Sequence, residues 1–195
     1  MEKGLYMAAM KGDTGFLSEA RVREIETGSW DEYLVSKTQR KNNIIHIATL
    51  HGRIDFIKFV LTLVNFSPLK LISQKNNDGN TPLHIASKKG NMGIVQLLVR
   101  YIGEPVQYQG EIEVAGGGGA DEARKRRPWA VANSEGNTAL HEAIIHGRIE
   151  VAKYLVEHYE ELAGFVNNRN ETPLHLAVTH NANGNFTLPS LLHLY

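Results

Sequence analysis

The stretch Thr81-Pro82-Leu83-His84-Ile85-Ala86 decides the fold of this chain because it returns, whole or in part, at four other places. Residues 172–177 repeat it in full, and residues 138–143 differ from it only at the proline. Fainter copies lie at 5–12 and 45–52, where an apolar residue, an alanine three places later and a glycine four further on keep the same frame. Self-similarity of this kind predicts a repeat architecture.

The spacing of the copies identifies the kind of repeat. The histidine position is occupied by Tyr6, His46, His84, His141 and His175, at intervals of 40, 38, 57 and 34 residues. A period of about 33 residues with the signature T-P-L-H-x-A is typical of ankyrin repeats, so the chain resembles the ankyrin-repeat family over nearly its whole length. The resemblance implies an all-α solenoid of about five stacked helix-turn-helix repeats with short projecting turns. We expect one domain over 1–195, with repeats at about 1–40, 41–75, 76–104, 133–166 and 167–195.

The residues around each copy predict where its helices begin and end. A threonine before proline is a favoured start, because the hydroxyl can cap the helix and proline has its φ preset at the first position. Asn43 and Thr138 can cap in the same way. Glycine is favoured just after a helix, and the frame places Gly12, Gly52, Gly90 and Gly147 there. Apolar residues at helical spacing then predict second helices over 54–60, 94–98 and 149–156.

Polar turns precede three of the helix starts, at 76–80, 133–137 and 167–171. Gly79 and Gly136 stand two places before threonine, and Asn170 takes that place in the last copy. Glycine and asparagine are the residues that best tolerate a positive φ, so we expect one there in each turn. These turns are the projecting fingers that the resemblance implies.

Composition excludes several classes of protein. Of the 195 residues, 42% are hydrophobic and 22% charged, which is ordinary for a globular chain and excludes collagen-like or wholly disordered ones. The 21 basic and 21 acidic residues cancel, so no overall charge attracts the chain to nucleic acid or anionic lipid. With no cysteine, disulfides, thiolate zinc sites and cysteine nucleophiles are excluded. The absence of cysteine also fits a reducing compartment. The most apolar stretch, 56–66, is shorter than the roughly 20 residues that span a bilayer, so we expect a soluble chain.

The interval of 57 residues predicts an insertion between the third and fourth repeats. We place it at 103–132, where four consecutive glycines precede Arg124-Lys125-Arg126-Arg127. Few apolar residues occur there, so we expect a flexible loop. The basic run is either a nuclear-targeting or phosphate-binding strip or, as nearby acidic residues favour, simply a solvated loop. The first two intervals are also long, which predicts longer helices or loops around 30–37 and 68–73.

The histidines suggest a metal site that the spacing argues against. His141 and His146 are five residues apart, whereas H-E-x-x-H zinc sites need four; five apart on a helix means about 140° of rotation rather than about 40°. Histidines of successive repeats lie about 8–10 Å apart, too far to share one ion. We expect each repeat histidine to bond its own capping turn and the backbone of the next repeat. No catalytic arrangement is apparent, so we expect no enzyme, no cofactor and no metal.

An ankyrin-like stack offers a wide concave surface to another protein. The resulting hypothesis is a protein-interaction scaffold with protein partners, no small-molecule substrate and no nucleic acid. The expected contact residues, at finger tips and exposed first-helix positions, are Asp78, Asn80, Lys88, Glu135, Asn137, Ile145, Arg169 and Glu171.

A finer resemblance rests on residues 5–13, 42–48 and 137–143, which look like those of plant ankyrin proteins of the accelerated-cell-death type. That family has an ankyrin array on the cytosolic side of a C-terminal membrane domain and acts in defence and stress signalling. The resemblance implies a cytoplasmic chain, or one at the cytosolic face of the plasma membrane. The alternative hypothesis is therefore the regulatory part of a membrane-anchored signalling protein.

The C-terminal stretch departs from the repeat pattern. Asn181 stands where glycine is expected, and Pro189 would cost about 3 kcal/mol inside a second helix. Residues 186–195 end in leucines and an aromatic residue rather than the polar face of a capping repeat. We expect a truncated product, a fragment or an isoform, whose last repeat frays or binds a partner.

Overall fold

Helices and turns make up the described part of this computed structural model, which covers residues 1–27, 30–64, 67–103 and 127–181. The first helices of the repeats are α1 (Lys3–Lys11), α4 (Ile44–Leu50), α7 (Pro82–Lys89), α10 (Ala139–Ile145) and α12 (Pro173–Asn181). The second helices are α2 (Thr14–Thr27), α5 (Ile54–Leu63), α8 (Met92–Ile102) and α11 (Ile149–His158). Three short helices are added: α3 (Trp30–Val35), α6 (Leu69–Ile72) and the 3₁₀-helix η2 (Glu160–Gly164). Over these ranges no strand is present.

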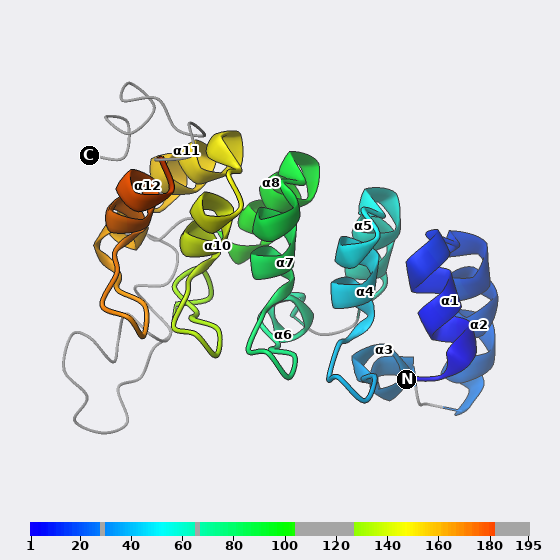
Figure 1. The fold of residues 1–195 in the computed structure, drawn as a ribbon. Coiled ribbons are helices and arrows are strands. Elements are labelled where there is room, and N and C mark those ends of the chain that lie inside the picture. The colour runs from blue at the N-terminus through cyan, green and yellow to red at the C-terminus, as the bar shows by residue number, and fades with distance from the viewer. Residues whose placement is uncertain (28–29, 65–66, 104–126, 182–195) are drawn as a thin grey trace.

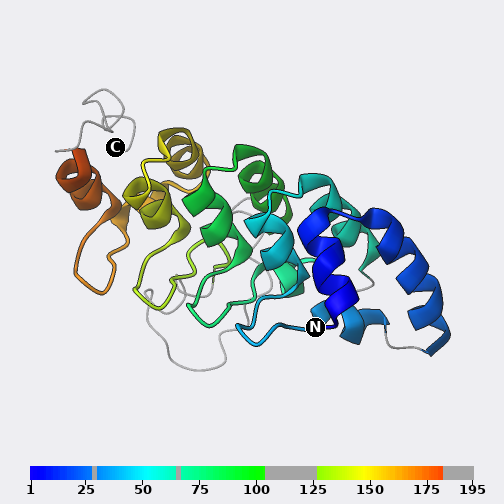
Figure 2. The ribbon, with the colours of Figure 1, turned by 45° about the vertical axis from the view of Figure 1, so that its right-hand side comes forward.

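The helix pairs stand side by side in a curved row, with the turns projecting from the same end of each pair (Figures 1 and 2). Each first helix packs against the next, from α1 through α4, α7 and α10 to α12, and α8 packs between α5 and α11. This is the all-α ankyrin-like solenoid that the repeat predicts. The contact between α7 and α10 joins the repeats on the two sides of the insertion.

The glycines after the first helices have the expected left-handed backbone. Their φ angles are +81° at Gly12, +69° at Gly52, +73° at Gly90 and +65° at Gly147. A β-carbon at Gly90 would also lie 2.7 Å from Cδ of Arg148, so a side chain there would displace that arginine. That arginine donates from Nε to the carbonyl of Lys88 at 3.2 Å, and Arg53 donates likewise to Met10 at 3.0 Å. An arginine of the following repeat thus caps the C-terminal end of α1 and of α7.

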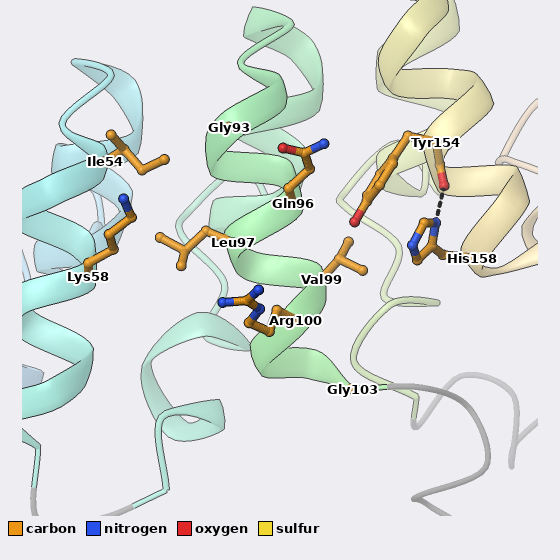
Figure 3. Close-up of a pocket in the computed structure, with 10 residues that line it drawn as sticks. All are labelled: Ile54, Lys58, Gly93, Gln96, Leu97, Val99, Arg100, Gly103, Tyr154 and His158. Carbon is orange, nitrogen blue, oxygen red and sulfur yellow. Dashed lines mark hydrogen bonds between the residues drawn. The ribbon is translucent and has the colours of Figure 1, made fainter.

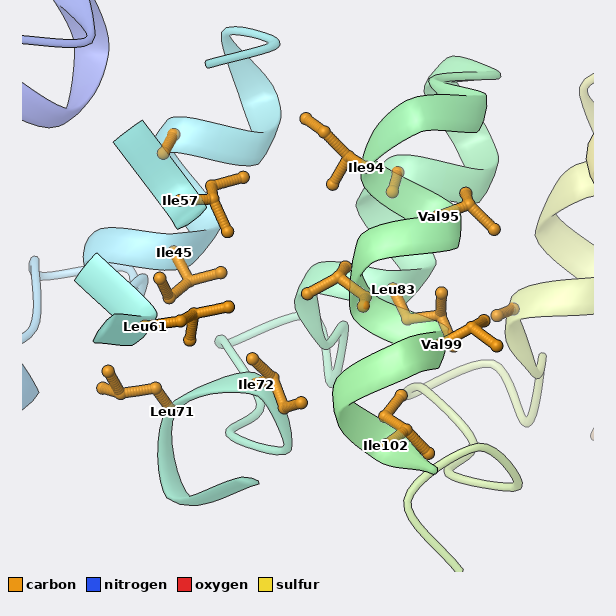
Figure 4. Close-up of a cluster of buried hydrophobic side chains, with 14 of the residues drawn as sticks. Ile45, Ile57, Leu61, Leu71, Ile72, Leu83, Ile94, Val95, Val99 and Ile102 are labelled. Carbon is orange, nitrogen blue, oxygen red and sulfur yellow. The ribbon is translucent and has the colours of Figure 1, made fainter. Parts of the chain in front are cut away.

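The core runs along the whole row because each repeat completes its apolar face with the next one. In Figure 4, Ile94 of α8 points towards α5, whereas Val95 and Val99 point the opposite way, towards the fourth repeat. The alanine of the shared frame is fully buried in repeats two to four, at Ala48, Ala86 and Ala143. A side chain this small lets neighbouring first helices approach closely.

The two long early intervals are explained by the short helices α3 and α6. Trp30 of α3 is 3% exposed and donates from Nε1 to the carbonyl of Leu63 at 3.3 Å. In α6, the carbonyl of Leu71 accepts from Nδ2 of Asn43 at 2.8 Å. Each added helix therefore lies against a repeat and is held there by a hydrogen bond.

The far end of the predicted insertion belongs to the folded array, which corrects the expected loop at 103–132. Trp129 is 1% exposed, and its ring stacks on that of Tyr159 with centroids 5.0 Å apart and planes 2° apart. Tyr159 also donates from its hydroxyl to the carbonyl of Gly103 at 3.0 Å. Burial of these two large rings stabilises the segment, although the residues before it are mostly polar or glycine. Residues 104–126 lie outside the described part of the chain.

Arg127, the last residue of the predicted basic run, takes part in the same junction. Its guanidinium pairs with the carboxylate of Glu161 and lies 5.7 Å from the ring of Trp129. Both side chains of the ion pair are about two-thirds buried. Arg127 therefore has a structural partner, whereas residues 124–126 lie outside the described part.

Candidate functional site

Four polar turns, here called the finger turns, project from the stack at residues 38–42, 76–80, 133–137 and 167–171. In each, the N–H of the first residue bonds the carbonyl of the last at 2.8–3.0 Å. An asparagine opens the last three, and its Oδ1 accepts backbone N–H groups two and four residues later, at 2.9–3.0 Å. Side chain and backbone together close each turn in one shape. The asparagines are Asn76, Asn133 and Asn167.

Each finger turn contains one residue with positive φ, as predicted for three of them. The angles are +57° at Lys41, +73° at Gly79, +78° at Gly136 and +61° at Asn170. A β-carbon on Gly79 would lie 2.5 Å from the amide nitrogen of Ser134 in the next turn. On Gly136 it would lie 2.5 Å from the amide nitrogen of Asn168. Glycine is therefore needed both for the conformation and for the close approach of the next turn.

Backbone hydrogen bonds join neighbouring finger turns into a ladder. The amides of Asn77, Ser134 and Asn168 each donate to a carbonyl in the preceding turn at 3.0 Å. The acceptors are the carbonyls of Arg40, Asp78 and Glu135. Because these bonds fix each turn relative to the last, the backbone positions that carry the exposed side chains are held in order along one edge.

Three of the four repeat histidines, His46, His84 and His141, connect their first helix to the next finger turn, which confirms the hydrogen-bonding role expected of them. His175 of α12 differs, because its side chain is exposed. Nε2 lies 3.0 Å from the carbonyl oxygen of Asn80 for His46, 3.0 Å from that of Asn137 for His84, and 3.1 Å from that of Glu171 for His141. At His84 and His141, Nδ1 accepts the N–H of the capping threonine at 3.2 Å. The proton is therefore assigned to Nε2, which donates it to the next repeat.

Burial keeps these imidazoles neutral. Desolvation lowers the pKa of His46 and of His84 from 6.5 to about 4, although the hydrogen bond to the next turn partly opposes this. Desolvation lowers the pKa of His141 as well, again opposed by its bond to the carbonyl of Glu171. At neutral pH His46, His84 and His141 are thus hydrogen-bonded but uncharged.

The structure places the expected contact residues in three environments. Four are exposed, namely Asp78, Lys88, Glu135 and Arg169. Three are half-buried, namely Asn80, Ile145 and Glu171. The eighth, Asn137, is only 1% exposed. The exposed charged side chains of Asp78, Glu135 and Arg169 follow one another along the finger turns.

Asn137 differs from the expectation of an exposed finger tip. Its Nδ2 donates to Oε1 of Glu142 at 3.2 Å, and its Oδ1 accepts from Nδ2 of Asn167 at 3.1 Å. Glu142, itself 6% exposed, also accepts from Nδ2 of Asn133 at 3.0 Å. These side chains hold adjacent turns together, so Asn137 is a stacking residue. The sequence showed only that an asparagine recurs in these turns. It did not show whether the side chain of that asparagine faces solvent or the neighbouring turn.

The hydrogen bonds of His141 and His146 argue against the apparent metal motif. His141 bonds Thr138 and the carbonyl of Glu171, whereas Nδ1 of His146 lies 3.0 Å from the carbonyl of Glu142 and 3.6 Å from its carboxylate. The two rings therefore have separate partners. Among the described residues, no group of three or more histidine, aspartate or glutamate side chains is placed to hold a metal ion.

One open groove is lined by second helices, and another is lined by first helices and a finger turn. One, of about 630 Å³, runs along α8 between α5 and α11 (Figure 3). Leu97 and Arg100 line it on the side facing α5, opposite Lys58, and Tyr154 and His158 line it on the α11 side. The other, of about 610 Å³, lies between α1, the first finger turn and α4. Both are open surface features that suit a polypeptide better than a small substrate.

No helix in the described ranges is both long enough and apolar enough to cross a bilayer.

Comparison with known proteins agrees with this architecture. The family model described as ankyrin repeats (3 copies) matches residues 5–109 and 119–191. The chain is 26% identical to Protein ACCELERATED CELL DEATH 6 of Arabidopsis thaliana over 142 residues, 73% of this chain and 19% of the relative.

Two further relatives are proteins whose names differ from that of the first. The putative palmitoyltransferase ZDHHC13 of Danio rerio is 26% identical over 84% of this chain and 21% of its own. The transient receptor potential cation channel subfamily A member 1 of Homo sapiens is 35% identical over 33% of this chain and 6% of its own. The chain thus spans about a fifth or less of the length of these relatives. With the family model matching most of its length, the chain belongs to the ankyrin-repeat family.

Proposed function

We propose that this chain is a non-catalytic protein–protein interaction scaffold in plant defence or stress signalling. The observation that carries the proposal is the ladder of finger turns, which holds the backbone positions of the exposed residues Asp78, Glu135 and Arg169 in order along one edge. Because the backbone there is already ordered, a partner would bind without the entropic cost of ordering these turns.

The non-catalytic assignment is supported by what the polar groups of the stack already do. The buried histidines bond the next repeat, and Glu142 accepts from two asparagines of its own repeat's finger turn, so these groups serve the fold rather than a reaction. The grooves are open on the surface and do not enclose a substrate away from water.

A second candidate is the regulatory part of a membrane-anchored signalling protein, acting at the cytosolic face of the plasma membrane. It is favoured by the similarity to Protein ACCELERATED CELL DEATH 6, of which this chain spans 19%. Fractionation of the full-length native gene product distinguishes the two: a free scaffold is recovered in the cytoplasmic fraction, and an anchored one with membranes.

The scaffold proposal is tested by partner capture from a plant lysate, using the intact chain as bait. Reversing the exposed finger charges with Asp78→Lys, Glu135→Lys and Arg169→Glu should abolish specific capture. The matched control reverses two exposed charges in the groove along α8, Lys58→Glu and Arg100→Glu, and should leave capture unchanged. Equal capture by both variants, with both folded by circular dichroism, would contradict the proposal.

A further inference from the structure

The groove between α1, the first finger turn and α4 combines an apolar floor with a cationic rim. Tyr6 of α1 and Ile47 and Leu50 of α4 line it and are here called its floor. The exposed residues Lys3 and Arg40 also line it and are here called its rim. It belongs to the same side of the stack as the first helices and finger turns.

The floor includes an apolar side chain that the fold itself does not bury. Leu50 is 44% exposed, although it lies on a first helix whose six preceding residues are all buried. In the third repeat the equivalent position is Lys88, which is also exposed but is charged. An exposed leucine beside half-buried Tyr6 gives the groove an apolar contact area that is available to another molecule.

The rim is strongly positive although the chain as a whole is neutral. Lys37, Arg40 and Lys41 are all exposed in or beside the first finger turn, and residues 36–43 contain no acidic residue. Lys3 is exposed across the groove. The later finger turns differ, since 76–80 and 133–137 contain only acidic charges and 167–171 contains one of each sign.

The positive charge at the groove is not neutralised locally. The groove lining includes no carboxylate, and Glu2, the nearest acidic residue in the sequence, is not part of it. Within the described residues, the side chains of Lys3 and Arg40 form no ion pair.

We infer that this groove binds an acidic segment of a partner protein that also presents apolar side chains. The inference rests on the proposed scaffold function and names the class of partner for one part of that surface. Exposed ion pairs contribute little each, so the carboxylates steer and select the segment while contact with Leu50 and Tyr6 supplies most of the affinity. Binding therefore weakens with added salt but is not abolished by it.

The test is selection of a random displayed peptide library on the intact chain, followed by affinity measurements on the enriched peptides. We expect enrichment of sequences that combine aspartate or glutamate with large apolar residues. The pair Lys3→Glu and Arg40→Glu should weaken their binding by about tenfold or more, because two exposed attractive pairs become repulsive. Leu50→Gln should weaken binding too, and the control pair Lys58→Glu and Arg100→Glu should not.

The outcomes separate this inference from the scaffold proposal. Enriched peptides without acidic residues, no enriched peptide at all, or peptides as sensitive to the control pair as to Lys3→Glu with Arg40→Glu would each overturn the inference. Peptides that lose binding only when Asp78 and Glu135 are reversed would overturn it while leaving the scaffold proposal intact. Peptides that bind only the groove along α8 would overturn the inference and would also contradict the finger turns as the binding edge of the scaffold.

Discussion

Acidification is expected to loosen the stack through its buried histidines. His46 and His84 are neutral when folded, with the pKa lowered to about 4, whereas in the unfolded chain each returns to its ordinary value of 6.5. Between these values the unfolded state binds protons that the folded state does not. The contribution to stability is therefore fully present above pH 6.5 and is lost as the pH falls from there towards 4.

The size of the effect follows from the two pKa values. At pH 5, proton binding to the unfolded state lowers the free energy of unfolding by about 2 kcal/mol for each histidine, or about 4 kcal/mol for the pair. Domains of this size are stable by only about 5–15 kcal/mol in total. His141, whose pKa is lowered in the same direction, adds to the loss.

Urea unfolding followed by circular dichroism at pH 7.5 and at pH 5 measures this loss. His84→Gln removes one titrating group, so the variant should lose about 2 kcal/mol less than the parent over this interval, although it starts less stable. His51 is exposed, and His51→Gln is the control that should keep the parent's pH dependence. If His84→Gln loses as much stability as the parent, the buried neutral histidine does not account for the effect.

Three further substitutions test the packing between repeats. Gly136→Ala forces a positive φ and a clash with Asn168, so thermal unfolding should show a loss of about 1–3 kcal/mol, whereas an unchanged midpoint would contradict the ladder geometry. Trp129→Ala should cost about 3–5 kcal/mol in urea unfolding and Trp129→Phe much less, and equal effects would show that stacking on Tyr159 is unimportant. Arg148→Ala should cost about 0.5–1.5 kcal/mol and raise amide exchange at the C-terminal end of α7; unaltered exchange there would refute the cap.

Features that recur in most of the repeats could be predicted from the sequence. The capping threonines, the glycines with positive φ and the histidines that reach the next turn each obey a local rule, and the copies repeat that rule in register. Asn170 in place of glycine is the clearest case, because only a residue that tolerates φ of +61° fits that place.

Features that depend on one particular neighbour could not be predicted. Trp129 follows a glycine-rich, charged stretch, and its burial depends on Tyr159, which comes thirty residues later, directly after α11. Asn137 lies in a turn of polar residues that the sequence predicts to be exposed. Its side chain is buried instead, because it hydrogen-bonds Glu142 and Asn167. The groove beside Leu50 arises where α1, a turn and α4 meet, so none of these segments indicates it alone.

The most direct test of the account is hydrogen–deuterium exchange of the intact chain with and without a captured partner. The account predicts added protection in the finger turns and first helices, chiefly at 38–50, 76–80 and 133–137, with α5, α8 and α11 unchanged. Protection confined to α5, α8 and α11 would contradict the claim that the ladder of finger turns forms the binding edge.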